Sequence, residues 1–220
     1  RGRPNANVVD IGGGHGQLAG PLIEAGYSVT VLGSAASCRN RIADLVDSGR
    51  CGWVVGDILQ LPFSDRAFDT VVCVRLLMHC EEWPRLVAEL CRVARERVVV
   101  DYPTSQSLNG LAPAFFGAKK KLEGNTRHWR SFRHRELEPV FEGNGFALNR
   151  RTGQFFWPMV LHRILRCVPV SRALEAPFRA LGLTARLGSP VIAEFVRTAP
   201  ERVRDPVESP DLSAFGLARS

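Results

Sequence analysis

Short apolar runs recur along the first hundred residues, and segments with helical periodicity separate them. The runs are rich in β-branched residues and mostly lack strict alternation, which is typical of strands covered by helices on both faces. They predict strands at 8–11, 28–32, 53–55, 70–74 and 97–100. Strands that alternate with helices favour an open parallel sheet with right-handed crossovers.

The clearest predicted helix follows Pro84, which suits the first turn of a helix. Beyond it, apolar residues recur along one face of the helix. They are Leu86, Val87, Leu90, Cys91 and Ala94.

After Tyr102 the pattern changes, and the predicted elements become longer and less regular. Residues 103–130 predict a long loop with room for one helix, and 136–143 predict a short helix that Pro139 would strain. The remaining predictions are a strand within 146–156, a helical stretch at 159–183 and a last strand at 190–196.

The chain of 220 residues is long enough for one well-packed domain. We expect that domain to span 1–198, with a basic insertion at 103–135 and a helical insertion at 158–188. Pro-rich polar sequence predicts a flexible C-terminal tail at 199–220. The chain begins at Arg1 without a methionine, which is compatible with a fragment that lacks an N-terminal region.

Composition excludes several classes of protein. With 45% hydrophobic and 23% charged residues, the chain has the composition of a folded globular protein. No uncharged run reaches the roughly 20 apolar residues that a membrane-spanning helix needs. The six cysteines form no Cys-x-x-Cys pair, so we expect neither a metal site nor disulfides, and instead free thiols in a reducing cytoplasm.

The net charge of +7 is concentrated in one segment. Residues 119–135 hold seven Lys and Arg residues and one acid, Glu123, and aromatic residues are interleaved with them. Nucleic-acid phosphates, an anionic membrane surface or an acidic substrate would each suit this segment, and so would a solvated loop that only aids solubility. A nucleic-acid role is the weaker interpretation, because no motif for base methylation accompanies the charge.

Glycines follow the first predicted strand directly in the stretch VVDIGGGHGQLAG. Asp10, Gly12, Gly14 and Gly16 form the pattern D-x-G-x-G-x-G, which brings backbone N–H groups close to a bound ligand. A dinucleotide fingerprint fits less well, because it would begin late, at Gly14. A nicotinamide enzyme would also have an acid at the end of the second strand, where this chain has Gly33.

A second stretch, from Gly56 to Pro103, adds further motifs in order. They are GD after the third strand, LPF and FD before the fourth, and ELCRVAR before the fifth. Together with the glycine motif, residues 7–103 resemble the class I S-adenosylmethionine-dependent methyltransferases, in particular the ubiquinone- and menaquinone-type small-molecule methylases. The resemblance implies a Rossmann-like, doubly wound α/β fold. Its seven-stranded sheet would be mostly parallel, with an antiparallel last strand and a helical insertion before that strand.

The resemblance also implies the residues of a cofactor site. The glycine loop, with Gly12, Gly13, Gly14 and Gly16, would approach the methionine part of S-adenosylmethionine, and Asp10 would interact with its amino group. Asp57 would accept a hydrogen bond from the adenine, with Ile58 packed on the ring. The floor near the sulfonium would be formed by Cys73, Val74 and Arg75.

The chain departs from the family at Gly33, where members commonly carry an acid that binds both ribose hydroxyls. Ser34 could supply one hydrogen bond instead, so we expect weaker cofactor binding or a shifted contact. Because of this departure, a non-catalytic descendant of the family is one alternative. The two others are an RNA methyltransferase that uses 119–135 and a nicotinamide-dependent oxidoreductase.

The predicted reaction is methyl transfer to a small, partly hydrophobic acceptor. His79, just past the fourth strand, is the candidate general base; a buried structural histidine is the alternative. The late apolar helices with their arginines are expected to cover the sheet or the acceptor pocket. They would alternatively provide an interfacial surface for peripheral membrane contact. The sequence indicates no oligomeric state.

Overall fold

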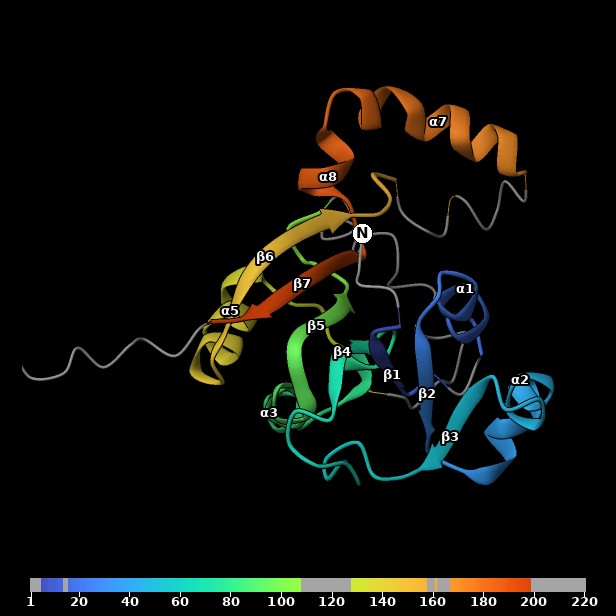
Figure 1. Ribbon diagram of the computed structural model, residues 1–220. Coiled ribbons are helices and arrows are strands. Elements are labelled where there is room, and N and C mark those ends of the chain that lie inside the picture. Colours follow the sequence, from blue (N-terminus) through green and yellow to red (C-terminus); the bar gives the residue numbers. More distant parts are fainter. Residues whose placement is uncertain (1–4, 14–15, 108–127, 158–160, 162–166, 199–220) are drawn as a thin grey trace, which may run out of the picture.

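The computed structural model describes residues 5–13, 16–107, 128–157, 161 and 167–198 (Figure 1). Its sheet has seven strands in the order β3-β2-β1-β4-β5-β7-β6. The strands are β1 (Asn7–Ile11), β2 (Ser28–Gly33), β3 (Cys51–Val55), β4 (Phe68–Cys73), β5 (Ala94–Tyr102), β6 (Phe146–Gly153) and β7 (Val191–Arg197). Strands β1 to β5 pair in parallel, whereas β7 lies antiparallel between β5 and β6. The predicted fold class is therefore confirmed.

Helices cover both faces of this sheet. Consecutive residues of a strand point to opposite faces, and Val31 and Leu32 of β2 accordingly enter two different apolar clusters. The helices are α1 (Ala19–Glu24), η1 (Ala36–Ile42), α2 (Ala43–Asp47), η2 (Leu77–His79), α3 (Trp83–Val93), α5 (His134–Gly143), α7 (Val168–Ala180) and α8 (Leu183–Leu187). The larger cluster lies under α3 and α5, and the smaller one lies under α1, η1 and α2.

The predicted strands and the helices around 84–94 and 136–143 are present, with boundaries shifted by a few residues. Of the predicted helical stretch at 159–183, α7 covers the later part, whereas 159–160 and 162–166 lie outside the described residues. Helix α3 has Pro84 in its first turn and buries Leu86, Val87, Leu90 and Cys91, as its periodicity predicts. Helix α5 contains Pro139, as expected. Strand β6 ends at Gly153, three residues before the predicted limit of 156. The predicted tail at 199–220 and most of the predicted loop at 103–130 lie outside the described residues.

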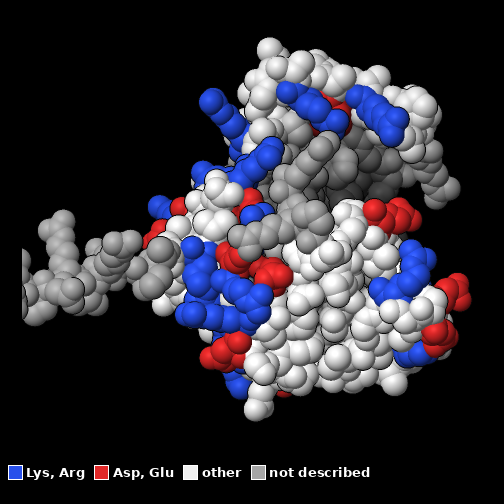
Figure 2. Space-filling model, viewed as in Figure 1, with Lys and Arg blue, Asp and Glu red and all other residues white. Residues whose placement is uncertain are grey.

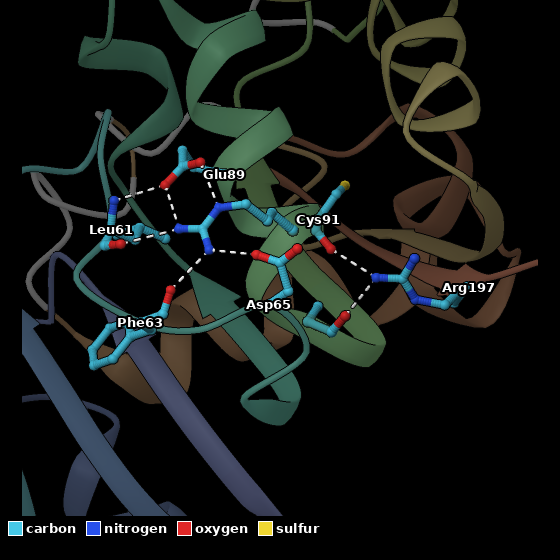
Figure 3. A network of polar contacts seen from close by, with 8 residues as sticks. Leu61, Phe63, Asp65, Glu89, Cys91 and Arg197 are labelled. Atoms are coloured by element: carbon cyan, nitrogen blue, oxygen red, sulfur yellow. Dashed lines mark hydrogen bonds and ion pairs between the residues drawn. The ribbon is translucent and has the colours of Figure 1, made fainter.

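Arg92, in the last turn of α3, connects that helix to the segment between β3 and β4 (Figure 3). Its guanidinium donates hydrogen bonds to the carbonyl oxygens of Leu61 and Phe63, at 3.0 and 2.8 Å, and to the carboxylates of Glu89 and Asp65, both at 2.8 Å. Glu89 in turn accepts the Leu61 N–H at 2.7 Å. The motifs LPF and ELCRVAR are therefore joined to each other and support the fold.

The FD motif has a similar role at the start of β4. The carboxylate of Asp69 accepts the backbone N–H of Asn7 at 2.9 Å and a hydrogen bond from Arg95 at 2.6 Å. At the same end of the sheet, Arg197 of β7 donates to the carbonyl oxygens of Cys91 and Ala94, at the end of α3 (Figure 3). Asp69 thus joins β4 to β1 and β5, and Arg197 joins β7 to the end of α3.

Candidate active site

The order of the strands reverses at β1, which has β2 on one side and β4 on the other. In open α/β sheets, ligands bind beyond the carboxyl ends of the strands at such a switch point. The loops that follow β1 and β4 begin at this place. Among them are Gly12, Gly13 and Gly16 of the first loop and Val74 and Arg75 of the second.

Glycine is required in the first loop because the protein itself occupies the side-chain space. Gly12 and Gly16 have left-handed backbones, with φ of 78° and 67°. A Cβ on Gly12 would lie 2.9 Å from Cδ2 of Leu76, and one on Gly13 would overlap Oδ2 of Asp10. A Cβ on Gly16 would meet the side chain of Ile42 in η1. The fourth candidate glycine, Gly14, lies outside the described residues.

Asp10 is a buried carboxylate at the end of β1. No hydrogen bond from another described residue reaches its side chain. Burial raises the pKa of Asp10 from 3.8 to about 6, because the ionised form loses contact with water. A cationic or hydrogen-bond-donating group of a ligand would stabilise the ionised carboxylate here.

Arg75 links the loop after β4 to the loop after β1. Its backbone is left-handed, with φ of 61°, and its N–H donates to Oδ1 of Asp101 at 2.5 Å. Its guanidinium donates to Oε1 of Gln17 at 3.0 Å. Sequence reasoning missed Asp101 and Gln17. The position of Asp101, directly after the apolar run of β5, was the signal that could have identified it.

Asp101 and Cys73 are buried beside this loop. Burial raises the pKa of Asp101, although the Arg75 N–H, the Arg75 guanidinium and His79 all act in the opposite direction. Burial also raises the pKa of the Cys73 thiol well above its usual value, and the side chain has no exposed surface. Cys73 could therefore face a ligand only through its backbone, whereas Val74 is partly exposed and Arg75 is exposed.

His79, the candidate base, is held at the end of η2. Its Nδ1 lies 2.8 Å from the carbonyl oxygen of His128. A carbonyl oxygen only accepts hydrogen bonds, so Nδ1 carries the proton and Nε2 of the neutral ring is left as the basic nitrogen. This is the tautomer that a general base acting through Nε2 requires.

The remaining predicted contacts lie at the same edge of the sheet, at the ends of β2 and β3. Asp57 is exposed, and its Oδ1 accepts the Leu59 N–H at 2.9 Å. Ile58 is half-buried and packs against the larger apolar cluster. Ser34 is exposed directly after β2. The fold thus places every described candidate residue at or next to the carboxyl ends of β1 to β4.

The basic segment is partly explained by structure. Arg130 forms an ion pair with Glu136 at 2.9 Å, and its guanidinium lies over the rings of Trp83 and Phe132, at 5.6 and 5.2 Å from their centroids. Its backbone N–H donates to the carbonyl oxygen of Met78. Arg130 therefore helps to fix the loop that carries His79. Lys119, Lys120, Lys121 and Arg127 lie outside the described residues.

The sheet order, the glycine turn after β1 and the acidic residue after β3 define a Rossmann-like domain of the class I methyltransferase type. Residues 9–100 match the family described as "Methyltransferase domain". This part of the chain is therefore a methyltransferase domain, and the resemblance seen in the sequence is confirmed.

Relatives with curated names support the same assignment. The chain is 29% identical over 171 residues to a malonyl-[acyl-carrier protein] O-methyltransferase of Methylococcus capsulatus, an alignment that covers 73% of this chain and 60% of that protein. It is 31% identical over 103 residues to cycloartenol-C-24-methyltransferase 1 of Oryza sativa, with 42% and 28% covered. The matches thus span 60% and 28% of the length of these two relatives.

Solved structures share the fold at low identity. Magnesium protoporphyrin IX methyltransferase of Synechocystis PCC 6803, with bound S-adenosylhomocysteine, aligns with a TM-score of 0.61 at 18% identity, covering 89% of this chain and 75% of that one. The [4+2]-cyclase SpnF aligns with a TM-score of 0.60 at 18% identity, covering 89% and 76%. The second name shows that the fold alone does not determine the reaction.

Proposed function

We propose that this protein transfers a methyl group from S-adenosylmethionine to a small, partly hydrophobic acceptor. The observation that carries the proposal is the methyltransferase-domain match over 9–100, which contains the glycine turn, Asp10 and Asp57 in one segment. The names of the malonyl-[acyl-carrier protein] and cycloartenol methyltransferases support an acceptor other than RNA.

The cofactor fits the chemistry of Asp10. A buried carboxylate without a partner among the described residues suits a cationic amino group, which would restore the electrostatic stabilisation that burial removes. Backbone N–H groups of the turn, including that of the undescribed Gly14, would face the amino-acid part. Asp57 and Ile58 would hold the adenine.

The reaction needs positioning more than covalent help from the protein. The cofactor supplies an electrophilic methyl group on a sulfonium, and charge disperses in the transition state. Val74, Arg75 and the backbone at Cys73 would shape the space next to that group, where the Asp101 and Gln17 contacts hold Arg75 in place. His79 would accept a proton from the acceptor at Nε2.

Calorimetry with S-adenosylhomocysteine and with NADH tests the cofactor assignment. We expect the homocysteine compound to bind and NADH to give no signal. Asp57→Ala should weaken binding of S-adenosylhomocysteine by about tenfold or more, because the adenine loses a hydrogen bond to a charged group. NADH binding without any response to S-adenosylhomocysteine would overturn the assignment.

We further propose that α7 and α8 make peripheral contact with an anionic membrane surface. Figure 1 shows α7 beyond the end of the sheet at which β5 ends, and Figure 2 shows basic side chains along it. Large apolar side chains are also exposed here. They are Val168 and Val170 in α7, Leu181 directly after α7, and Leu187 in α8.

The charges of α7 and α8 fit the same partner. Their acid, Glu175, is buried and accepts the backbone N–H groups of Phe156 and Trp157, both at 3.0 Å. The outward surface therefore presents the basic residues Arg172, Arg179 and Arg186 without a counter-charge from α7 or α8. Apolar and basic side chains together suit an interfacial helix.

In the described part of the chain, no helix is long and apolar enough to span a bilayer. Sedimentation with lipid vesicles tests this contact.

A further inference from the structure

The ends of β2 and β3 are paired up to their last residues. Gly33 is the register partner of Val55, and the Gly33 carbonyl accepts the N–H of Gly56 at 3.2 Å. Trp53 lies two residues before Val55 and therefore points to the same face of the sheet. It is diagonal to Gly33 on that face, within reach of a large aromatic side chain.

The Trp53 ring occupies the space of a side chain at position 33. A Cβ built on Gly33 would lie 2.7 Å from Cζ2 of Trp53, 3.2 Å from Cζ3 and still nearer to Cη2. The ring is rigid and packs against the smaller apolar cluster, which restricts its movement. Gly33 itself is buried.

The residues directly after β2 are uncharged. Nucleotide-binding sheets of this kind commonly place a carboxylate at the end of the second strand, where it binds ribose hydroxyls. Here residues 33–38 contain no acid, and Val55 is 48% exposed at the end of the neighbouring strand. The carboxylates nearest in sequence to the ends of β1 and β3 are Asp10 and Asp57, one on each side of this uncharged stretch.

We propose that Trp53 and Gly33 form an apolar support for the ribose. The site then binds the cofactor by its two ends, and its affinity does not depend on the ribose hydroxyls. This inference rests on the proposed function. Asp10 would hold the amino-acid end and Asp57 the purine end, while the indole and Val55 contact the sugar without hydrogen bonds. Trp53 is therefore a specificity-determining residue, because its ring excludes an acid from position 33.

Calorimetry with S-adenosylhomocysteine and its 2′-deoxy and 3′-deoxy analogues tests the inference. We expect each deoxy analogue to bind within about threefold of the parent compound, because no charged acceptor is lost. A loss of about tenfold or more with either analogue would overturn the inference and leave the proposed function intact. If S-adenosylhomocysteine itself does not bind, the proposed function fails and the inference fails with it.

Paired variants test the role of the ring directly. Trp53→Val frees the space but adds no charge, so its affinities for the parent and deoxy compounds should remain within about threefold of each other. Trp53→Val combined with Gly33→Asp restores the missing carboxylate, and we expect it to prefer the parent compound by about tenfold. Circular dichroism confirms that each variant is folded. A folded double variant that still ignores the hydroxyls, or a Trp53→Val variant that discriminates between them, would contradict the assignment.

Discussion

At the scale of single residues, the site depends on groups that are poorly solvated and held in one orientation. Asp10 is buried without a partner among the described residues, and His79 is fixed through Nδ1 by a backbone carbonyl. Arg75 occupies a left-handed conformation that Asp101 stabilises. Measurements of stability, cofactor binding and reaction rate can therefore test the roles of Asp10 and His79.

Asp10 should make the ligand-free protein less stable as the pH rises. Between pH 3.8 and about 6 the folded state binds more protons than the unfolded state, so the free energy of unfolding falls across this range and levels off above it. The pKa shift corresponds to about 3 kcal/mol. Asp10→Asn should remove this slope and be more stable than the parent protein at neutral pH, as measured by urea unfolding.

The same variant should bind the cofactor poorly. We expect calorimetry with S-adenosylhomocysteine to show a loss of about tenfold or more for Asp10→Asn, because the amide has no charge for the amino group. An Asp10→Asn protein that loses stability at neutral pH and keeps its affinity would show that the carboxylate has a structural partner instead.

His79 should affect the reaction and leave cofactor binding unchanged. In His79→Asn the amide nitrogen can still donate to the His128 carbonyl, but the basic nitrogen is lost. We expect kcat to fall by about 10²–10⁴-fold with an acceptor that must lose a proton, while the affinity for S-adenosylhomocysteine stays within about twofold. Equal kcat values for the two proteins would identify His79 as a structural residue.

At the scale of elements, the family motifs of the sequence prove to be contacts between segments. Glu89 and Arg92 of α3 hold the LPF segment, and Asp69 joins β4 to β1 and to Arg95. These residues lie in the fold and away from the candidate site. Motifs at family spacing can therefore identify a fold because they stabilise it, whatever reaction it carries.

Arg92→Met tests this scaffold. The substitution keeps an apolar stem and removes every donor, so the carbonyls of Leu61 and Phe63 and the carboxylate of Glu89 lose their partner. We expect the free energy of unfolding to fall by about 2–4 kcal/mol in urea titrations. Arg92→Lys should fall between the parent protein and Arg92→Met, since it keeps the charge and loses the planar fork.

The matched control for Arg92 is Arg85, on the same helix. Arg85 is exposed, and its ion pair with Glu82 is 3.6 Å long at the surface. Arg85→Met should therefore change the free energy of unfolding by less than about 0.5 kcal/mol. If both substitutions destabilise the protein equally, the network around Arg92 has no special role.

At the scale of the whole molecule, one end of the sheet carries the candidate chemistry and the other carries the scaffold. The glycine turn, Arg75 and His79 lie beyond the carboxyl ends of β1 and β4, whereas Arg92, Asp69 and Arg197 join elements where β4 and β5 begin. Helix α7 projects beyond the first of these ends (Figure 1). A membrane surface that contacts α7 would therefore lie near the acceptor side of the site.

Vesicle sedimentation tests this arrangement. We expect binding to vesicles that contain phosphatidylserine and little binding to neutral vesicles. Arg172→Gln combined with Arg179→Gln should weaken the binding by about tenfold or more, since each arginine near an anionic surface contributes about 1 kcal/mol. Arg50→Gln with Arg66→Gln, two exposed arginines before β3 and β4 at the opposite end of the sheet, is the control for charge alone. Equal losses of vesicle binding in both double variants would assign the effect to net charge. If neither the parent protein nor the control variant binds vesicles, α7 and α8 only cover the sheet and the proposed membrane contact is wrong.

The sequence by itself determined the alternation of strands and helices, the sheet class, the glycine turn and the family, because periodicity and motif spacing are local properties of the chain. The sequence also predicted Asp10, Asp57 and His79 as site residues, and the structure places them at or just beyond the carboxyl ends of β1, β3 and β4. Only the tertiary structure decided what fills the space beside each glycine. Leu76, Ile42 and the ring of Trp53 come from segments distant in sequence. Their contacts depend on packing between elements, which no local pattern records.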